Sequence, residues 1–114
     1  MPNPTDCRAE IPPGTLDMLI LQTVARSGES HGFEIAEAIS KASAAVLQVE
    51  EGSLYPALQR LLIKGWLVGE WGRTAENRRA RYYQITPAGR KQLAHELAGY
   101  HRVSIAIAAV LRPA

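Results

Sequence analysis

The chain has 114 residues, a length that fits one domain. Its formal net charge is only +2. It contains no apolar run near the roughly 18 residues that a membrane span needs, and its first residues lack the basic and apolar regions of a secretory signal. We therefore expect a cytoplasmic protein without a membrane segment. Cys7 is the only cysteine, which excludes an internal disulfide and a cysteine-based zinc site within one chain.

The charges are unevenly distributed along the sequence. Residues 1–58 carry eight acidic and three basic side chains, a net charge of −5. Residues 59–114 carry ten basic and three acidic side chains, a net charge of +7. A basic second half favours an anionic partner, but many proteins have one basic face. The charge alone therefore does not decide between nucleic acid and other partners.

The first residues predict an arm followed by a helix. Residues 1–13 contain four prolines and little periodicity, which is typical of a flexible N-terminal arm. A helix is then expected from Thr15, which can act as its N-cap, to Gly28. Met18 and Leu21 widen the apolar stripe of this helix. The helix is thus either buried on most sides or also contacts a second subunit, through residues such as Leu16.

Two further helices follow. The second is expected to open at residues 30–32 and to turn Phe33, Ile35, Ala36 and Ile39 inward, and residues 45–49 have the composition of a brief strand. The third has leucines at positions 54, 58, 61 and 62, which place one apolar face on a helix. Ser53 is its expected N-cap, which leaves Pro56 in the first turn where a proline is tolerated; the helix boundary can also lie a turn earlier.

The rest of the chain predicts a hairpin and a long helix. Gly65 ends the third helix, and residues 66–71 and 81–86 have strand composition around a basic turn at 72–80. Thr86 and Pro87 begin a last helix that runs towards Leu111. Apolar residues line one side of this helix along most of its length, and we call this line its apolar seam. The seam is longer than a small core can cover, which indicates a homodimer. With Leu16, the expected interface residues are Leu93, Leu97, Tyr100, Val103, Ile107 and Val110.

This order predicts a mainly α fold with a small β-hairpin. It corresponds to a winged helix-turn-helix over residues 14–86 and a C-terminal dimerisation helix over 87–114. The exposed face of the third helix would enter the major groove of double-stranded DNA, and the hairpin would contact phosphates or the minor groove. The candidate DNA-binding residues are Ser53, Tyr55, Pro56, Gln59, Arg60, Lys64, Arg73, Arg78, Arg79 and Arg81.

Other functions have less support in the sequence. The three histidines are scattered, and there is no glycine-rich phosphate loop, so we expect no enzyme, no metal and no cofactor. The aromatic residues Trp66, Trp71, Tyr82 and Tyr83 either stack a flat ligand or pack the hairpin against the helices. A winged-helix module that docks an acidic protein, without sequence-specific DNA binding, is the alternative to a DNA-binding regulator.

Four motifs stand out along residues 14–92. They are Gly14-Thr15-Leu16 with Leu19-Ile20-Leu21, His31-Gly32-Phe33-Glu34-Ile35, Gly52-Ser53-Leu54-Tyr55-Pro56-Ala57-Leu58 and Tyr82-Tyr83-Gln84-Ile85-Thr86-Pro87-Ala88-Gly89. Together they resemble the PadR family of bacterial transcriptional regulators. The Tyr-Pro pair followed by leucines, combined with a hairpin that ends in Ile-Thr-Pro-Ala-Gly, is the most specific part of this likeness.

The resemblance implies a homodimeric repressor that binds a roughly palindromic operator. It also implies that the helix opening at Ser53 is the recognition helix, that the hairpin of residues 73–81 is the wing, and that the single last helix places the chain in the short subfamily. Some relatives bind phenolic acids or flat hydrophobic drugs between the subunits. Here the last helix has one aromatic residue, Tyr100, which argues against an aromatic drug pocket, and the sequence identifies no effector.

Overall fold

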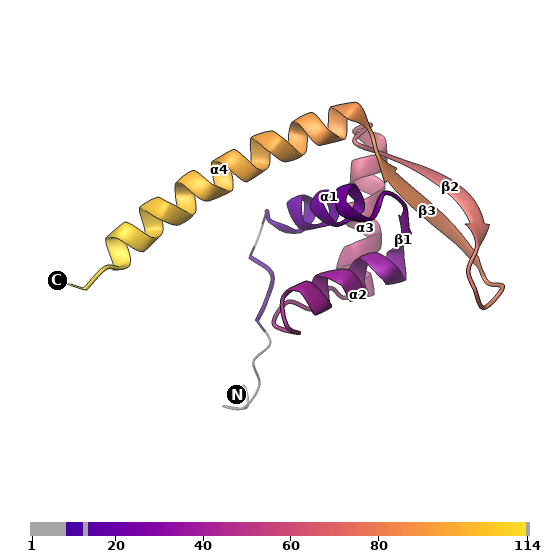
Figure 1. Cartoon of the computed structure of the whole chain (residues 1–114), viewed down its shortest axis with the longest axis horizontal. Helices are drawn as coiled ribbons and strands as arrows, with labels where there is room; N and C mark the ends of the chain where they lie inside the picture. The colour runs from indigo at the N-terminus through magenta and orange to yellow at the C-terminus, as the bar shows by residue number, and fades with distance from the viewer. Residues whose placement is uncertain (1–8, 13, 114) are drawn as a thin grey trace.

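The computed structural model describes residues 9–12 and 14–113, so Cys7 and most of the expected N-terminal arm lie outside it. The described residues form helices and one small antiparallel sheet, which confirms the predicted fold class (Figure 1). In chain order the elements are α1 (Leu16–Ser27), β1 (Ser30–His31), α2 (Gly32–Ala42), α3 (Glu51–Ile63), β2 (Leu67–Arg73), β3 (Arg79–Ile85) and α4 (Pro87–Leu111).

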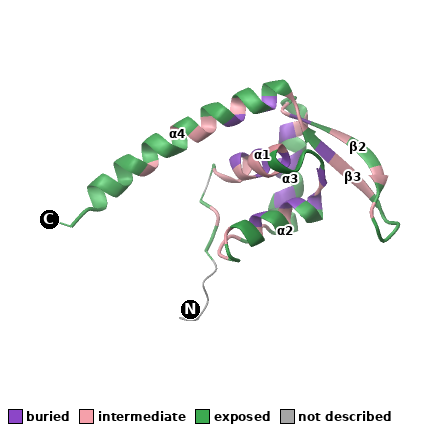
Figure 2. Cartoon of the chain, in the orientation of Figure 1, coloured by how far each residue is buried: buried purple, intermediate pink, exposed green. Residues whose placement is uncertain are grey.

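The hydrophobic core lies where α1, α2 and α3 meet the base of the hairpin and the start of α4. Figure 2 shows that buried residues occupy the inner sides of the three short helices. Met18 and Leu21 of α1 are both in this core, so their apolar side chains are covered by the chain itself. The buried hydrophobic residues are Met18, Ile20, Leu21, Val24, Ile35, Ile39, Leu54, Ala57, Leu58, Leu61, Leu67, Tyr83 and Leu93.

The start of α2 lies within the predicted residues 30–32, but one of its side chains points in another direction than expected. His31 forms the short strand β1 with Ser30 and then caps α2, because its ring accepts a hydrogen bond from the Glu34 amide while the Glu34 carboxylate accepts one from the His31 amide. The helix therefore begins at Gly32, and Phe33 falls on its outer side with 68% of its surface exposed. The prediction that Phe33 points inward was wrong, whereas Ile35 and Ile39 are buried as expected.

The start of α3 differs from the expected one. The helix begins at Glu51 with Glu50 as N-cap, so Ser53 is not the cap and Pro56 lies inside the helix rather than in its first turn. The missing N–H of Pro56 leaves the Gly52 carbonyl without its helical donor. Because Gly52 is exposed, water can hydrate that carbonyl, which explains why the proline is tolerated.

The sheet has the strand order β1-β3-β2. In the hairpin Trp71 pairs with Arg81 and Arg73 with Arg79, so both strands run further than expected and the turn shrinks to residues 74–78. The brief strand expected at 45–49 is reduced to one bridge between Leu47 and Ala9. There the Ala9 amide donates to the Val46 carbonyl at 2.8 Å, which ties the end of the arm to the α2–α3 connection.

A tight junction joins α3, the hairpin and α4. Gly65 follows α3 with a positive φ of 77°, and the amides of Gly65 and Trp66 donate to the carbonyls of Leu62 and Leu61. Such a left-handed residue closes a helix and is favourable only for glycine or asparagine. Thr86 donates its hydroxyl to the Gly65 carbonyl at 2.7 Å and accepts a hydrogen bond from the Gly89 amide at 2.9 Å. The predicted roles of Gly65 and Thr86 are confirmed.

Helix α4 leaves the body of the protein. Its first turns are covered, since Gly89 and Leu93 are buried. Beyond Leu97 the helix extends outward, and Figure 1 shows its C-terminal end far from the other elements. The length of this helix accounts for the elongated shape, with a longest extent of 56 Å.

The two glycines of α4 provide a test of the junction. A Cβ at Gly89 would collide with the Trp66 carbonyl oxygen, whereas a Cβ at Gly99 would meet nothing within 4 Å. Gly89→Ala is expected to lower the free energy of unfolding by about 1–3 kcal/mol through overpacking. Gly99→Ala should raise it by about 0.5–1 kcal/mol, because alanine favours the helix. Urea unfolding at equal protomer concentration measures both, and an unchanged stability in Gly89→Ala would contradict this packing.

Candidate nucleic-acid interface

Helix α3 turns one strip of residues directly away from the core. Gly52, Pro56, Gln59 and Ile63 follow one another at helical spacing on this side, and all four are exposed. Gln59 is the only one whose side chain carries both a hydrogen-bond donor and an acceptor. We call these four residues the outer strip of α3. Its shape and chemistry allow it to contact base edges inside a DNA groove.

The other candidate residues of α3 flank the outer strip. Tyr55 lies on the side of the hairpin, where its ring packs against Gly32. Arg60 lies on the opposite side, and its Nη2 is 2.9 Å from Oδ1 of Asp17 in α1. Lys64 follows the helix with its Nζ 4.8 Å from the Trp66 ring centroid. The guanidinium of Arg60 is thus held against α1 instead of projecting along the strip.

Ser53 and Pro56 share a hollow with Arg60. This hollow, of about 550 Å³, lies between α3 and the described residues of the arm, including Glu10 and Pro12. Among the predicted α3 residues, Gln59 thus faces outward, Tyr55 faces the hairpin, and Ser53 and Arg60 face the arm. Pro56 belongs to the outer strip and also borders the hollow.

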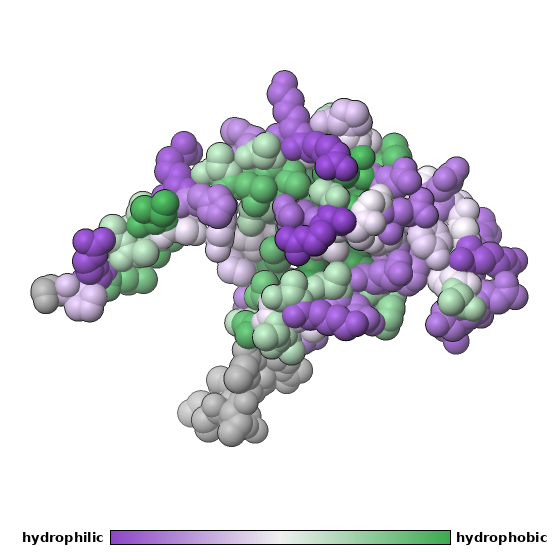
Figure 3. Space-filling view, viewed as in Figure 1, coloured by the Kyte–Doolittle hydropathy of each residue, from purple (hydrophilic) through white to green (hydrophobic). Residues whose placement is uncertain are grey.

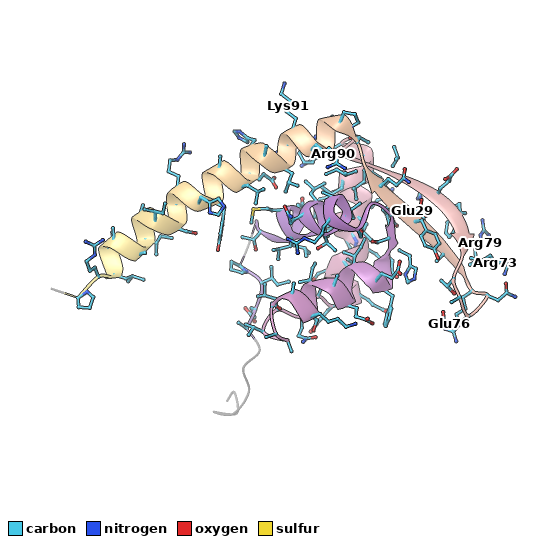
Figure 4. All side chains as sticks on the ribbon, viewed as in Figure 1. Glu29, Arg73, Glu76, Arg79, Arg90 and Lys91 are labelled. Carbon is cyan, nitrogen blue, oxygen red and sulfur yellow. The ribbon has the colours of Figure 1, made fainter. Side chains whose placement is uncertain are left out.

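The arginines of the hairpin gather on one face. The hairpin register pairs Arg79 with Arg73 and Arg81 with Trp71. All four side chains therefore lie on the same face of β2 and β3. The guanidinium carbon of Arg79 lies 4.4 Å from the Trp71 ring centroid, a cation–π contact that orders the arginine. Figure 4 labels Arg73 and Arg79 near the free end of the hairpin.

The hairpin turn keeps Arg78 exposed. Asn77 adopts a positive φ of 61°, which asparagine tolerates better than most residues, and its amide donates to the Thr74 carbonyl. Arg73 donates from Nη1 to the Asn77 carbonyl at 3.2 Å, which braces the turn. Arg78 therefore lies beyond the paired strands as an exposed cation.

A hollow of about 950 Å³ separates the hairpin from the first residues of α2 and α3. We call it the wing cleft. The helices contribute Phe33 and Tyr55 to its wall, and the hairpin contributes Trp71, Arg79 and Arg81. Figure 3 shows that the surface of the hairpin end is predominantly hydrophilic. The wing cleft thus combines cationic groups with aromatic rings on both sides.

Arg81 and Tyr83 lie at the inner end of the wing cleft. Arg81 is half-buried against Gly69, and its buried Nε has no hydrogen-bond partner among the described residues. Tyr83 is buried, and burial raises the pKa of its hydroxyl above the ordinary value of 10.0, although the Arg81 charge acts in the opposite direction. Tyr83 therefore stays neutral at physiological pH, and Arg81 keeps donors available.

The residues predicted for a subunit interface differ in their burial. Leu93 is buried in the chain's own core, and Leu16 and Leu97 are partly buried against it. The later residues of the seam are open, with exposed fractions that rise from 49% for Tyr100 to 83% for Val110. Within one chain only the C-terminal half of the seam is free, and it lies on the part of α4 that leaves the body (Figure 2).

The described ranges offer neither a cluster of metal ligands nor a membrane-spanning helix. No group of three or more His, Cys, Asp or Glu side chains among residues 9–12 and 14–113 is placed to hold a metal ion. Within the same ranges, none of the helices is both long enough and apolar enough to cross a membrane.

Comparison with known proteins identifies the family. The family model described as "Transcriptional regulator PadR-like family" matches residues 20–95, well over half of the chain. The chain belongs to the PadR-like family of transcriptional regulators. PadR regulators are DNA-binding proteins with a winged helix-turn-helix, and they are not enzymes.

Individual relatives agree with this assignment. An uncharacterised protein of Lysinibacillus sphaericus is 31% identical over 86 residues, which cover 75% of this chain and 78% of that protein. The transcriptional regulator Rv3488 of Mycobacterium tuberculosis is 38% identical over 72 residues, covering 63% and 64% respectively. A solved structure of a transcriptional regulator from Clostridium thermocellum superposes with a TM-score of 0.78 at 27% identity, covering 87% of this chain and 95% of that one.

In this PadR-family chain, sequence reasoning missed part of the wing cleft. Phe33 was expected in the core, and His31 was read only as part of a helix start, yet both line the cleft. The packing interpretation is confirmed for Tyr83, which is buried, and for Trp66, which packs on the core, whereas Trp71 is 59% exposed. Strand alternation could have placed Trp71 with the arginines. Helical spacing could have placed Phe33 on the outer side of α2, since two positions along a helix are about 200° apart and Ile35 points inward.

The Asp17–Arg60 pair gives a prediction about DNA binding. Both side chains are partly exposed, so breaking the pair in Asp17→Asn should cost less than about 1 kcal/mol of stability. The freed guanidinium should then reach phosphates, strengthening binding to random duplex and steepening the salt slope by up to about 0.9. Fluorescence anisotropy across a salt series measures this effect. The double variant Asp17→Asn with Arg60→Gln is the control, and an equal gain in it would mean that Arg60 is not responsible.

Proposed function

We propose that this chain acts as a homodimeric repressor that binds a palindromic operator. The observation that carries the proposal is the open outer strip of α3 beside a hairpin whose arginines share one face. A helix and a hairpin arranged in this way can reach the major groove and the neighbouring backbone of one duplex together.

In this proposal α3 is the recognition helix. Gln59, at the centre of the outer strip, reads an adenine edge, and Pro56 and Ile63 fill the groove beside it. Ser53 and Tyr55 contact phosphates or base edges near the start of the helix, and Lys64 reaches the backbone. Arg60 is paired with Asp17 in this structure, and it contacts the DNA once that ion pair breaks.

The hairpin is the wing. Arg73, Arg78, Arg79 and Arg81 contact phosphates or a narrow minor groove, and the exposure of Arg78 and Arg79 supports this role. Contacts of this kind do not depend on base sequence, so the wing contributes affinity and register while α3 contributes specificity.

The subunit contact in the proposal is made by α4. Tyr100, Val103, Ile107 and Val110 form the free part of the seam, and their exposed apolar side chains are covered when a second α4 packs on them. Leu16, Leu93 and Leu97 support that interface from the chain's own core. A two-fold dimer then presents its recognition helices to half-sites about 34 Å apart.

The same proposal divides the chain by function. Residues 1–13 are an arm, residues 14–86 the DNA-binding winged helix-turn-helix, and residues 87–114 the dimerisation helix, as in the short PadR subfamily. Because Leu93 belongs to the core, the first turns of α4 also complete the DNA-binding domain. A regulator of this kind works in the cytoplasm of a bacterium, where the chromosome lies.

Two variants separate the proposed roles of α3 and the wing. Gln59→Ala should weaken binding to the operator by about 1–3 kcal/mol and leave random duplex unaffected, because only a base contact is lost. Arg78→Ala combined with Arg79→Ala should weaken both duplexes alike and flatten the salt slope by about 1.8, since two phosphate contacts are lost. Anisotropy titrations measure both effects. Equal losses on the two duplexes in Gln59→Ala, or a base-specific loss in the arginine variant, would refute these roles.

A charged residue introduced into the exposed part of the α4 seam tests the proposed dimer. Ile107→Glu should convert the dimer to a monomer, because a carboxylate buried without a partner is costly. Ala98→Glu, which lies on the opposite side of α4 by helical spacing, is the matched control and should remain dimeric. Analytical ultracentrifugation reports the mass of each variant. A wild-type monomer at micromolar concentration, or a dimer in Ile107→Glu, would rule out this interface.

A further inference from the structure

The wing cleft has more exposed aromatic side chains than duplex binding requires. Phe33 is 68% exposed, Trp71 59% and Tyr55 50%. Phosphate contacts need cations and hydrogen-bond donors, and intact base pairs present only their edges in the grooves. The Arg79 guanidinium lies over one face of Trp71, and Phe33 is stacked near His31. The ring surface that stays exposed in the cleft is suited to another flat ring, such as an unpaired base.

The hairpin side of the same cleft provides a place for an anion. Arg81 has a buried Nε without a partner among the described residues, and Arg79 lies beside it on the same face of the hairpin. An arginine with unused donors binds a phosphate more strongly than a neutral donor does. The ring-binding and anion-binding groups are thus parts of one hollow.

The acidic residues on the rim do not cancel this preference. Glu37 is paired with Lys41 at 2.9 Å, and Glu34 is engaged in capping α2 through the His31 amide. Glu76 lies in the turn at the free end of the hairpin, whereas Arg81 lies at the inner end of the cleft. At that inner end the Nη groups of Arg81 are the donors that a phosphate can reach, because the chain itself covers Nε.

We propose that the wing cleft is a binding site for a nucleotide unit with an unpaired base. The base lies between Phe33 and Trp71, and the phosphate is held by Arg81 with help from Arg79. The volume of about 950 Å³ lies within the range of small-molecule sites, so a mononucleotide fits with room for its sugar. The unit is either a free nucleotide or an unpaired base of a single strand, since both present this chemistry.

The inference has a regulatory consequence that rests on the proposed function. If the wing arginines contact duplex phosphates, a nucleotide on Arg81 and Arg79 competes with the operator. Binding in the cleft then releases the protein from DNA by direct exclusion, without a conformational change in the dimer.

The test is titration of the full chain with named probes, read by isothermal calorimetry and by tryptophan fluorescence. The probes are AMP and thymidine monophosphate, a short oligothymidine strand, benzoate and inorganic phosphate. We expect nucleotides to bind saturably, with a Kd below about 1 mM, and to quench the tryptophan fluorescence. Arg81→Met should weaken it at least about 10-fold through loss of a charged hydrogen bond. Trp71→Leu should remove the quenching, and Arg90→Met on α4 is the matched control.

Each outcome decides the proposal. Binding of mononucleotides supports a free nucleotide, and binding of oligothymidine alone supports a single strand. No saturable binding of either, or binding equal to that of phosphate or benzoate and unchanged in Arg81→Met and Trp71→Leu, would overturn it. Duplex titrations of the same proteins keep the two claims apart. Duplex binding without nucleotide binding refutes only the cleft, whereas nucleotide binding without duplex binding refutes only the proposed function.

Discussion

The junction around Thr86 is the constraint on which the rest of the structure depends. Thr86 donates to the Gly65 carbonyl, accepts from the Gly89 amide, and pairs its own amide with the Trp66 carbonyl at 3.0 Å. These bonds connect the end of α3, both strands of the hairpin and the start of α4 within a few residues. Gly89 makes the contact possible, because any side chain there would collide with the Trp66 carbonyl. The recognition helix, the wing and the dimerisation helix of the proposal therefore share one fixed point.

Fixing these elements at one end leaves their other ends free. The outer strip of α3 and the tip of the hairpin face away from the core, and the far half of α4 has no covering element within the described chain. In the proposed dimer, this arrangement lets two subunits hold their recognition helices at the spacing of a duplex. The wing cleft arises from the same geometry, because the hairpin diverges from α2 and α3 (Figure 1).

Much of the fold could be predicted because its signals are local. Gly65, Thr86 and Pro87 mark helix ends through backbone conformation and hydrogen bonding of their immediate neighbours, and the α4 seam is readable from spacing. The position of Phe33 in the wing cleft could not be predicted, since the hairpin is placed beside α2 by the pairing of β1 with a strand some fifty residues later. The ion pair of Arg60 with Asp17 joins positions 43 residues apart and is equally invisible in the sequence. The sequence thus nominates a set of candidate residues, and the structure adds the directions in which their side chains point.

The measurement that tests the central claim most directly is fluorescence anisotropy of the full chain on two labelled duplexes across a salt series. One duplex carries the DNA upstream of the protein's own gene, and the other is a scrambled version of the same composition. A regulator that reads sequence through α3 should prefer the upstream duplex by roughly 10³-fold or more. Affinity for both should fall steeply with salt, because the wing contacts phosphates. Equal affinity for the two duplexes at every salt concentration, or no binding at low salt, would contradict the claim.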